Sequence, residues 1–254
     1  MKILAITQAR YGSSRFPGKI LKEIDGKSLL EIHLMRISKS KLISKLKVAT
    51  TNEADAIRIE ECCNKLKIDV YKGSLEDVLE RFYFAAKEEN PDFLVRLTSD
   101  CPLIDPEVID NVISFTIEND CDYGSNTLNP TYPDGIDVEV FKYSVLKAAY
   151  ENATLKSDRE HVTPYIWKNS SYKGGKLFKS MSYENIEDYS SHRLTVDKHE
   201  DFLVIEKLIK ELGINKSWKD YVTFLESHNE IMLLNKHFGR NEGYQKSINE
   251  DKNI

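Results

Sequence analysis

A stretch of ten residues near the start of the chain concentrates positive charge in a flexible setting. Arg10, Arg15 and Lys19 lie within it, and glycine and serine residues, among them Ser13 and Ser14, stand between them. Glycine lets backbone N–H groups approach a ligand closely, and clustered cations neutralise phosphate oxygens. The stretch predicts a phosphate-binding loop with Arg15 and Lys19 on the phosphates. The alternative is an ordinary solvated basic turn.

This loop lacks two well-known phosphate-binding patterns. Neither the G-x-x-x-x-G-K-[ST] sequence of P-loops nor the G-x-G-x-x-G sequence of dinucleotide sites occurs in it. It does follow Ile3–Thr7, an apolar run that predicts a buried strand. Ligands of open α/β sheets bind beyond the carboxyl ends of the strands. We therefore expect the loop to lie at the ligand-binding edge of a sheet.

A carboxylate follows a second apolar run. Asp100 comes soon after Phe93–Leu97, which predicts another strand of the same sheet. Carboxylate oxygens are ligands that Mg²⁺ prefers, and Mg²⁺ would neutralise charge on a nucleotide phosphate. Asp100 is therefore a candidate metal ligand and catalytic residue. The alternative is a turn cap beside Pro102.

A second group of polar side chains suits a small hydroxylated acceptor. Tyr132, Asp134, Asp137 and Glu139 lie close together in the sequence. If the intervening apolar residues of an extended strand face the core, Asp137 and Glu139 share the opposite face. We expect this face to hydrogen-bond acceptor hydroxyls.

Arg159 and His161 form a further candidate pair before an aromatic stretch. Arg159 would bind an acceptor carboxylate or phosphate through two hydrogen bonds, and His161 would orient a hydroxyl. The alternatives are a surface ion pair for the arginine and a structural role for the histidine. Arg81 is another cation that we expect near the nucleotide.

Alternating apolar runs and helical patterns predict an α/β fold with a mainly parallel, twisted sheet and helices on both faces. The expected strands are Ile3–Thr7, Lys45–Thr50, Asp69–Lys72, Phe93–Leu97, Tyr123–Asn126 and Val138–Phe141. The expected helices are Leu29–Ser38, Asp55–Leu66, Ser74–Lys87, one that starts at Asp105-Pro106, Tyr143–Ala153 and Asp201–Leu212.

The chain of 254 residues suits one domain, which we place at residues 1–240, with a small β-rich acceptor segment at about 125–190. The polar tail, residues 241–254, is expected to fray. A net charge of −5 argues against nucleic acid as a partner. No apolar run approaches bilayer length, and four cysteines without metal-site spacing read as reduced thiols, so we expect a cytoplasmic protein that does not bind membranes.

Several motifs, in order along the chain, resemble those of the sugar-acid cytidylyltransferases, which include the acylneuraminate and 3-deoxy-manno-octulosonate enzymes. The likeness is closest to the spore coat polysaccharide biosynthesis branch. The motifs are Ala9-Arg10-x-x-Ser13-x-Arg15-x-Pro17-x-Lys19, Gly73-Ser74-x-x-Asp77-Val78-Leu79-x-Arg81, Asp100-Cys101-Pro102-Leu103-Ile104-Asp105-Pro106, Tyr132-Pro133-Asp134-Gly135-x-Asp137-Val138-Glu139-Val140-Phe141 and Arg159-Glu160-His161-Val162-Thr163-Pro164-Tyr165.

The resemblance implies a GT-A-like nucleotidyltransferase fold, a divalent metal such as Mg²⁺, and transfer of CMP from CTP to a sugar acid of the nonulosonate kind. By the same resemblance Arg10 and Ser13 join the nucleotide site, and Asp197, at the end of Arg193-Leu194-Thr195-Val196-Asp197, is a second metal ligand. The alternative for Asp197 is a helix N-cap. A homodimer that meets through residues 125–190 is also implied.

Three other functions stay open from the sequence. One is a cytidylyltransferase whose acceptor is a phosphorylated sugar or alcohol. Another is a glycosyltransferase of the same fold, although its usual D-x-D pair is absent at Asp100-Cys101-Pro102. The third is a nucleotide-binding protein without catalysis.

Overall fold

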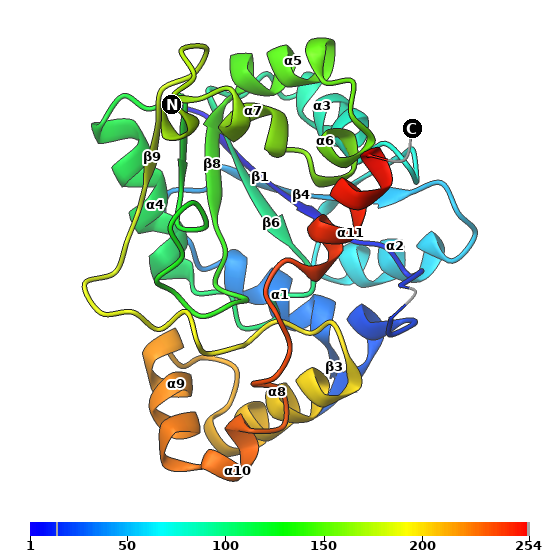
Figure 1. Cartoon of the computed structure of the whole chain (residues 1–254). Helices are drawn as coiled ribbons and strands as arrows, with labels where there is room; N and C mark the ends of the chain where they lie inside the picture. Colours follow the sequence, from blue (N-terminus) through cyan, green and yellow to red (C-terminus); the bar gives the residue numbers. More distant parts are fainter. Residues whose placement is uncertain (14, 253–254) are drawn as a thin grey trace.

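A central seven-stranded sheet, in the order β5-β4-β1-β6-β8-β7-β9, organises the chain (Figure 1). The computed structural model describes residues 1–13 and 15–252, so Ser14 of the first loop and the last two residues of the tail lie outside it. Neighbouring strands from β5 to β6 are parallel, whereas β8 runs antiparallel to both β6 and β7. The edge strand β9 is parallel to β7. The predicted mainly parallel α/β fold is confirmed.

The strands have short, well-defined bounds. They are β1 (Ile3–Gln8), β2 (Glu23–Ile24), β3 (Lys27–Ser28), β4 (Lys45–Thr51), β5 (Asp69–Gly73), β6 (Phe93–Thr98), β7 (Tyr123–Ser125), β8 (Glu139–Lys142) and β9 (Ser180–Ser182). The helices are α1 (Leu29–Ile37), α2 (Ala56–Lys65), α3 (Val78–Lys87), α4 (Pro106–Glu118), α5 (Tyr143–Asn152), α6 (Lys156–His161), α7 (Pro164–Lys168), α8 (His199–Leu212), α9 (Trp218–Ser227), α10 (Asn229–Met232) and α11 (Glu242–Asp251).

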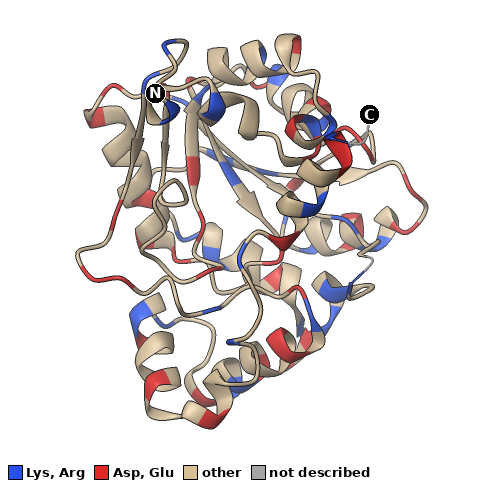
Figure 2. Ribbon diagram, viewed as in Figure 1, with Lys and Arg blue, Asp and Glu red and all other residues tan. Residues whose placement is uncertain are grey.

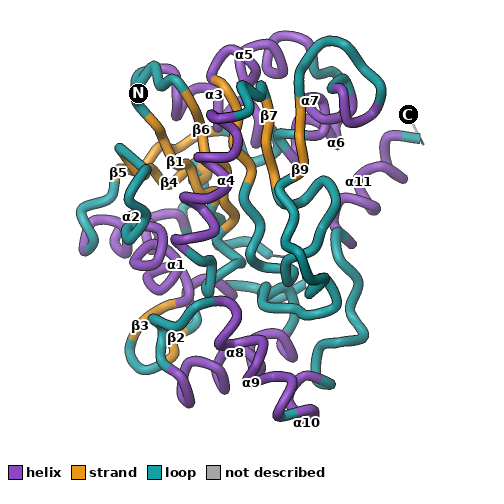
Figure 3. Tube along the Cα trace, turned by 90° about the vertical axis from the view of Figure 1, so that its left-hand side faces the viewer, coloured by secondary structure: helices purple, strands orange, loops and turns teal. Residues whose placement is uncertain are grey.

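Strand β1 shows how the sequence creates two hydrophobic layers. Its Ile3 and Ala5 pack with α1, α4, α8 and α9, whereas Leu4 and Ile6 pack with α3 and α5 on the other face. Successive side chains of a strand point to opposite faces, so an uninterrupted apolar run is buried on both sides. Figure 3 shows α8, α9 and α10 gathered below the sheet.

The sequence predicted strands β1 and β4 to β8 and helices α1 to α5 and α8, but misplaced some of their ends. It did not predict β2, β3, β9, α6, α7, α9 and α10. Helix α3 begins at Val78 rather than at Ser74, because the Asp77 side chain accepts a hydrogen bond from Glu80 N at 2.8 Å and so caps the helix there. Residues 125–190, expected to be rich in β-structure, contain helices α5, α6 and α7 between the short strands β8 and β9.

The tail is the largest departure from expectation. Residues 242–251 were expected to fray and instead form α11, which lies beside α6 (Figure 1). Its polar sequence lacks an apolar stripe, so periodicity gave no signal for a helix.

Within the described residues, no helix is both long and apolar enough to cross a bilayer. The four cysteines are buried and free. Lys and Arg residues alternate with Asp and Glu residues along much of the ribbon in Figure 2.

We expect Gly135→Ala to destabilise the fold strongly. Gly135 has φ +106°, and an added Cβ would lie 2.5 Å from the backbone of Leu194 and Thr195. Strain and a backbone clash together should cost about 3 kcal/mol or more. Gly174→Ala is the matched control, because Gly174 has the left-handed conformation (φ +76°, ψ 7°) with open space around it and should cost only about 1 kcal/mol. Equal losses in urea unfolding would contradict this account.

Candidate active site

A pocket of about 720 Å³ opens at the carboxyl ends of β1 and β6. Its walls come from the first loop, the loop after β6, the segment before β8, helices α6 and α7, and α11. This is the edge at which ligands of α/β sheets bind. Candidate site residues that line it are Arg10, Ser13, Arg15, Lys19, Arg81, Asp100, Asp134, Asp137, Glu139, His161 and Asp197.

The centre of the pocket is an ion cluster around Lys19. Its Nζ lies 3.2 Å from Asp100 Oδ2 and 2.8 Å from Asp197 Oδ1, and it donates to the Val196 carbonyl at 2.6 Å. Arg15 Nη2 lies 2.7 Å from the same Asp197 oxygen. The structure thus brings together four residues that the sequence predicted for the nucleotide and metal site.

Electrostatics favour the charged forms of Lys19 and Asp197. Burial alone would lower the pKa of the Lys19 ammonium, but Asp100 and Asp197 outweigh burial and raise it. Burial would likewise raise the pKa of Asp197, but Lys19 and Arg15 outweigh it and hold that pKa below its ordinary value. Asp100 and Asp197 each lie beside the Lys19 ammonium in the pocket.

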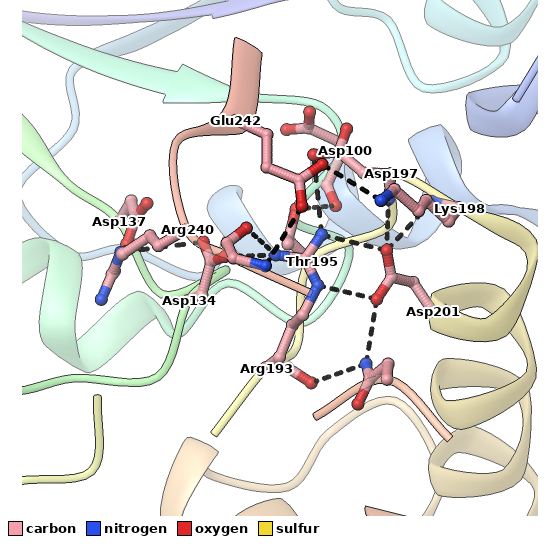
Figure 4. Close-up of polar contacts among 12 residues, drawn as sticks. Asp100, Asp134, Asp137, Arg193, Thr195, Asp197, Lys198, Asp201, Arg240 and Glu242 are labelled. Carbon is pink, nitrogen blue, oxygen red and sulfur yellow. Dashed lines mark hydrogen bonds and ion pairs between the residues drawn. The ribbon is translucent and has the colours of Figure 1, made fainter. Parts of the chain in front are cut away.

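Backbone contacts fix the two carboxylates relative to each other. Val196 N donates to the Asp100 carbonyl at 2.7 Å, and Thr195 Oγ1 donates to the same oxygen at 3.1 Å. The backbone N–H of Asp197 donates to Asp201 Oδ2 at 2.9 Å (Figure 4). Asp201, and not Asp197, therefore accepts the hydrogen bonds at the start of α8, which removes the N-cap alternative for Asp197.

The same two carboxylates suit a divalent cation. The Lys19 ammonium already lies where oxygens of Asp100 and Asp197 converge, so a positive charge is accommodated there. Mg²⁺ is commonly held by one or two carboxylates together with substrate phosphates, and it keeps several waters. Among the described residues, no cluster of three or more His, Cys, Asp or Glu side chains offers a complete protein cage for a metal. The two carboxylates fit a metal whose remaining ligands come from nucleotide phosphates and water.

A buried histidine supports the loop that carries Asp100. His33 Nδ1 donates to the Cys101 carbonyl at 2.8 Å, and its Nε2 accepts from the Thr7 hydroxyl at 2.9 Å. Burial lowers the pKa of His33 to about 4. One neutral imidazole therefore ties the end of β1 and the loop after β6 to α1. The sequence analysis did not single out this residue.

The acceptor-side carboxylates Asp134 and Asp137 are paired with arginines. Arg193 Nη1 lies 2.6 Å from Asp134 Oδ2, and Arg240 Nη2 forms an ion pair with Asp137 Oδ1 (Figure 4). Burial, then the neighbouring carboxylate Asp137, raises the pKa of Asp134. Burial also raises the pKa of Asp137, against the effect of Arg240. Arg240 was not anticipated, because its partners lie about a hundred residues away in the sequence.

Glu139 is a buried residue that lines the acceptor side of the pocket. It accepts from Tyr123 Oη and Thr163 Oγ1, each at 2.6 Å, and forms an ion pair with Arg96. The apolar neighbours of Glu139, Val138 and Val140, are fully buried in the core. The predicted alternation is thus confirmed, and Glu139 faces the pocket with its oxygens already engaged.

Two predicted acceptor residues lie elsewhere. Tyr132 does not line this pocket, because its ring packs against Trp218 with centroids 5.2 Å apart in the core. Arg159 is also absent from the lining, since its Nε lies 2.6 Å from Asp77 Oδ2 and its Nη1 donates to two backbone carbonyls of α5 and its end. The Arg159 guanidinium anchors α6 to the start of α3, and the placement of both residues corrects their assignment.

Arg81 is the least satisfied cation of the nucleotide side. It is 2% exposed, and its Nε and Nη1 have no hydrogen-bond partner among the described residues. Burial, and then the nearby Arg10, lower its pKa to about 10. An unpaired buried donor is costly, so an anionic ligand in the pocket would stabilise it. This supports the expectation that Arg81 lies near the nucleotide.

Comparison with known proteins gives the family. The cytidylyltransferase family profile matches residues 4–235. The chain belongs to the cytidylyltransferase family. This cytidylyltransferase is 34% identical over 218 residues to the spore coat polysaccharide biosynthesis protein SpsF of Bacillus subtilis, covering 83% of the chain and 88% of the relative. The predicted likeness to the spore coat branch is therefore confirmed.

Two further comparisons agree with that family. The cytidylyltransferase is 36% identical over 116 residues to the 3-deoxy-manno-octulosonate cytidylyltransferase of Geobacter metallireducens, which is 45% of this chain and 44% of the relative. It superimposes on the structure of a cytidylyltransferase from Leptospira borgpetersenii with a TM-score of 0.87 and 32% identity, covering 94% of this chain and 100% of that one. The predicted class, a CTP-dependent nucleotidyltransferase, is confirmed at this level.

We expect His33→Gln to reduce the loss of unfolding free energy that accompanies a fall in pH. The pKa of His33 is about 4 in the fold and 6.5 when unperturbed, so the wild type loses stability as pH falls from 6.5 to 4. That loss is of the order of 3 kcal/mol. Urea unfolding at pH 7, 6, 5 and 4 measures it. Exposed His237→Gln is the control. Parallel curves for H33Q and the wild type would contradict the prediction.

Proposed function

We propose that this cytidylyltransferase transfers CMP from CTP to a sugar acid of the nonulosonate kind and releases pyrophosphate. The observation that carries the proposal is the convergence of Arg15, Lys19, Asp100 and Asp197 in one pocket at the ligand-binding edge of the sheet. Cations for a triphosphate and carboxylates for a divalent metal thus lie side by side.

The residues of the chain have separable tasks in this reaction. Arg15 and Lys19 bind the phosphates of CTP, and Arg10, Ser13 and Arg81 line the same side of the pocket. An acceptor hydroxyl oxygen forms a bond to the α-phosphorus while the bond from that phosphorus to the bridging oxygen of pyrophosphate breaks. Pyrophosphate leaves with the electron pair, and the proton of the substrate hydroxyl passes to a base. Preorganised cations stabilise the charge that develops.

Asp100 and Asp197 would hold Mg²⁺ in this scheme. Bound there, the metal supplies neutralisation of charge on the α-phosphate and the leaving pyrophosphate. The Lys19 ammonium contacts both carboxylates from one position. It would then also contact phosphate oxygens of CTP.

The choice of a sugar acid is supported by the relatives and by the acceptor side of the pocket. One relative is named for transfer to 3-deoxy-manno-octulosonate and another for spore coat polysaccharide biosynthesis. His161 and Thr163, which line the same pocket, offer hydrogen-bond acceptor atoms for an acceptor hydroxyl. By this inference the product serves the biosynthesis of a surface polysaccharide or glycan.

An acceptor screen tests the proposal. Purified protein is mixed with Mg²⁺ and CTP, ATP, GTP or UTP, and with sugar acids, sugar phosphates or alcohol phosphates, and pyrophosphate release is followed. We expect release with CTP and a sugar acid. Release only with a phosphorylated acceptor would show that the substrate is a sugar phosphate or an alcohol phosphate and not a sugar acid. Hydrolysis of a nucleotide sugar with inert CTP would indicate a glycosyltransferase, and binding of CTP without turnover in any mixture would indicate a sensor.

We expect Asp100→Asn to lower turnover by about a hundredfold or more, because one metal-binding carboxylate is lost from the reacting centre. Asp100 is 30% exposed in its side chain, so the fold should keep a near-normal melting temperature. Exposed Asp55→Asn, at a residue whose side chain makes no cap hydrogen bond, is the matched control. Turnover that survives in D100N would show that the metal assignment is wrong.

We also propose a homodimer that meets through residues 125–190. The edge strand β9 lies in this segment, and large apolar side chains around it are exposed: Leu177 at 57%, Met181 at 37% and Ile186 fully. Exposed apolar groups that gather at one edge favour association. Ile186→Glu should shift sedimentation from dimer to monomer, whereas Leu233→Glu, at an exposed residue just after α10, should not. A monomeric wild type would contradict the proposal.

A further inference from the structure

Helix α11 forms one wall of the active-site pocket. Residues from Glu242 to Ser247, together with Glu250, line it. The helix lies on the side of the sheet that faces the viewer in Figure 1, and Figure 3 shows it at the matching edge of the molecule beside α6 and α7. The match to the family profile ends at residue 235, before α11 begins.

Polar contacts hold α11 in place. The three hydrophobic clusters of the described chain include no residue of α11, and Ser247 is the one residue of the helix that is buried. Ser157 N donates to Asp251 Oδ1 at 3.2 Å, and Lys156 Nζ lies 3.5 Å from Glu250 Oε2. These polar contacts, together with the Tyr244 ring that packs edge-to-face against Trp167 with centroids 6.0 Å apart, orient the helix.

The buried Ser247 links α11 to a pocket residue. Its Oγ lies 2.8 Å from Glu160 Oε2, 3.1 Å from the Gly243 carbonyl and 3.0 Å from His161 Nε2. The hydroxyl has one proton, and both Glu160 and Gly243 present acceptors only. The carboxylate is the stronger of these acceptors, so the proton points to Glu160. His161 Nε2 must then donate its own proton to Ser247 Oγ.

We propose that Ser247 is a positioning residue that fixes His161 as the Nε2–H tautomer, so that its unprotonated Nδ1 accepts a hydrogen bond from a hydroxyl of the sugar-like acceptor. This inference rests on the proposed function for the identity of the acceptor. It gives α11 a part in the acceptor site, through the chain of contacts from Glu160 to Ser247 to His161.

The surroundings of His161 agree with this role. Burial lowers the pKa of His161 to about 4, so the ring is neutral near pH 7 and one nitrogen keeps a lone pair. Among the described residues, the hydrogen bonding of His161 engages its Nε2 alone. The Tyr244 ring of α11 meets the imidazole edge-to-face with centroids 5.1 Å apart, which restricts its rotation.

Steady-state kinetics of pyrophosphate release test the positioning role. Ser247→Ala should raise the KM for the acceptor about tenfold, the effect of one lost hydrogen bond, and leave the KM for CTP within about twofold. Ser247→Thr keeps the hydroxyl and should restore the acceptor KM. Exposed Ser227→Ala is the matched control. An unchanged acceptor KM in S247A, or an equal rise in the KM for CTP, overturns the proposal.

A measurement without substrates separates this proposal from the proposed function. Imidazole-¹⁵N NMR at pH 7 reports the tautomer of His161, assigned by the signal that His161→Gln removes. We expect the Nε2–H form in the wild type and a mixture of tautomers in S247A. An Nδ1–H form in the wild type, or no change in S247A, overturns the role of Ser247. Absence of turnover in the wild type with every acceptor would instead contradict the proposed function.

Discussion

The buried ion cluster of Lys19 with Asp100 and Asp197 is the constraint on which the site depends. Its members come from three distant parts of the chain, so the cluster forms only when the first loop, the end of β6 and the segment before α8 are all in place. Buried charges are tolerated only when they are paired, and removal of one partner leaves an uncompensated charge. The architecture around the pocket therefore follows from keeping these three groups together.

A second charged network extends the same principle to the acceptor side. Arg193 contacts Asp134 and also Asp201 at the start of α8, so one guanidinium joins the acceptor loop to the segment that carries Asp197. Asp201 in turn accepts the backbone N–H of Asp197. Three consecutive hydrogen-bonded contacts therefore connect the acceptor loop to the segment that carries the carboxylate beside Lys19. The nucleotide and acceptor sides form one polar framework and not two independent sites.

The sequence predicted those parts of the site whose signals are local. The cations of the first loop and Asp100 follow apolar strands directly, and the edge at which parallel strands end brings them together. Arg159 and Tyr132 were misplaced because their partners, Asp77 and Trp218, are fixed by packing between distant elements. Helix α11 was missed for a different reason: an amphipathic period predicts a helix only when an apolar face is buried, and this helix binds through polar groups.

Helix α11 also has a consequence for the order in which the enzyme is made. The pocket is lined from Gln8 to Glu250, so its first and last wall residues are separated by nearly the whole described chain. During synthesis the sheet and the Lys19 cluster gain their last packing partners, α8 and α9, once Ser227 has left the ribosome, while the wall formed by α11 is still missing. A nascent chain at that stage has a pocket open on one side, and the site is completed in a separate, later step.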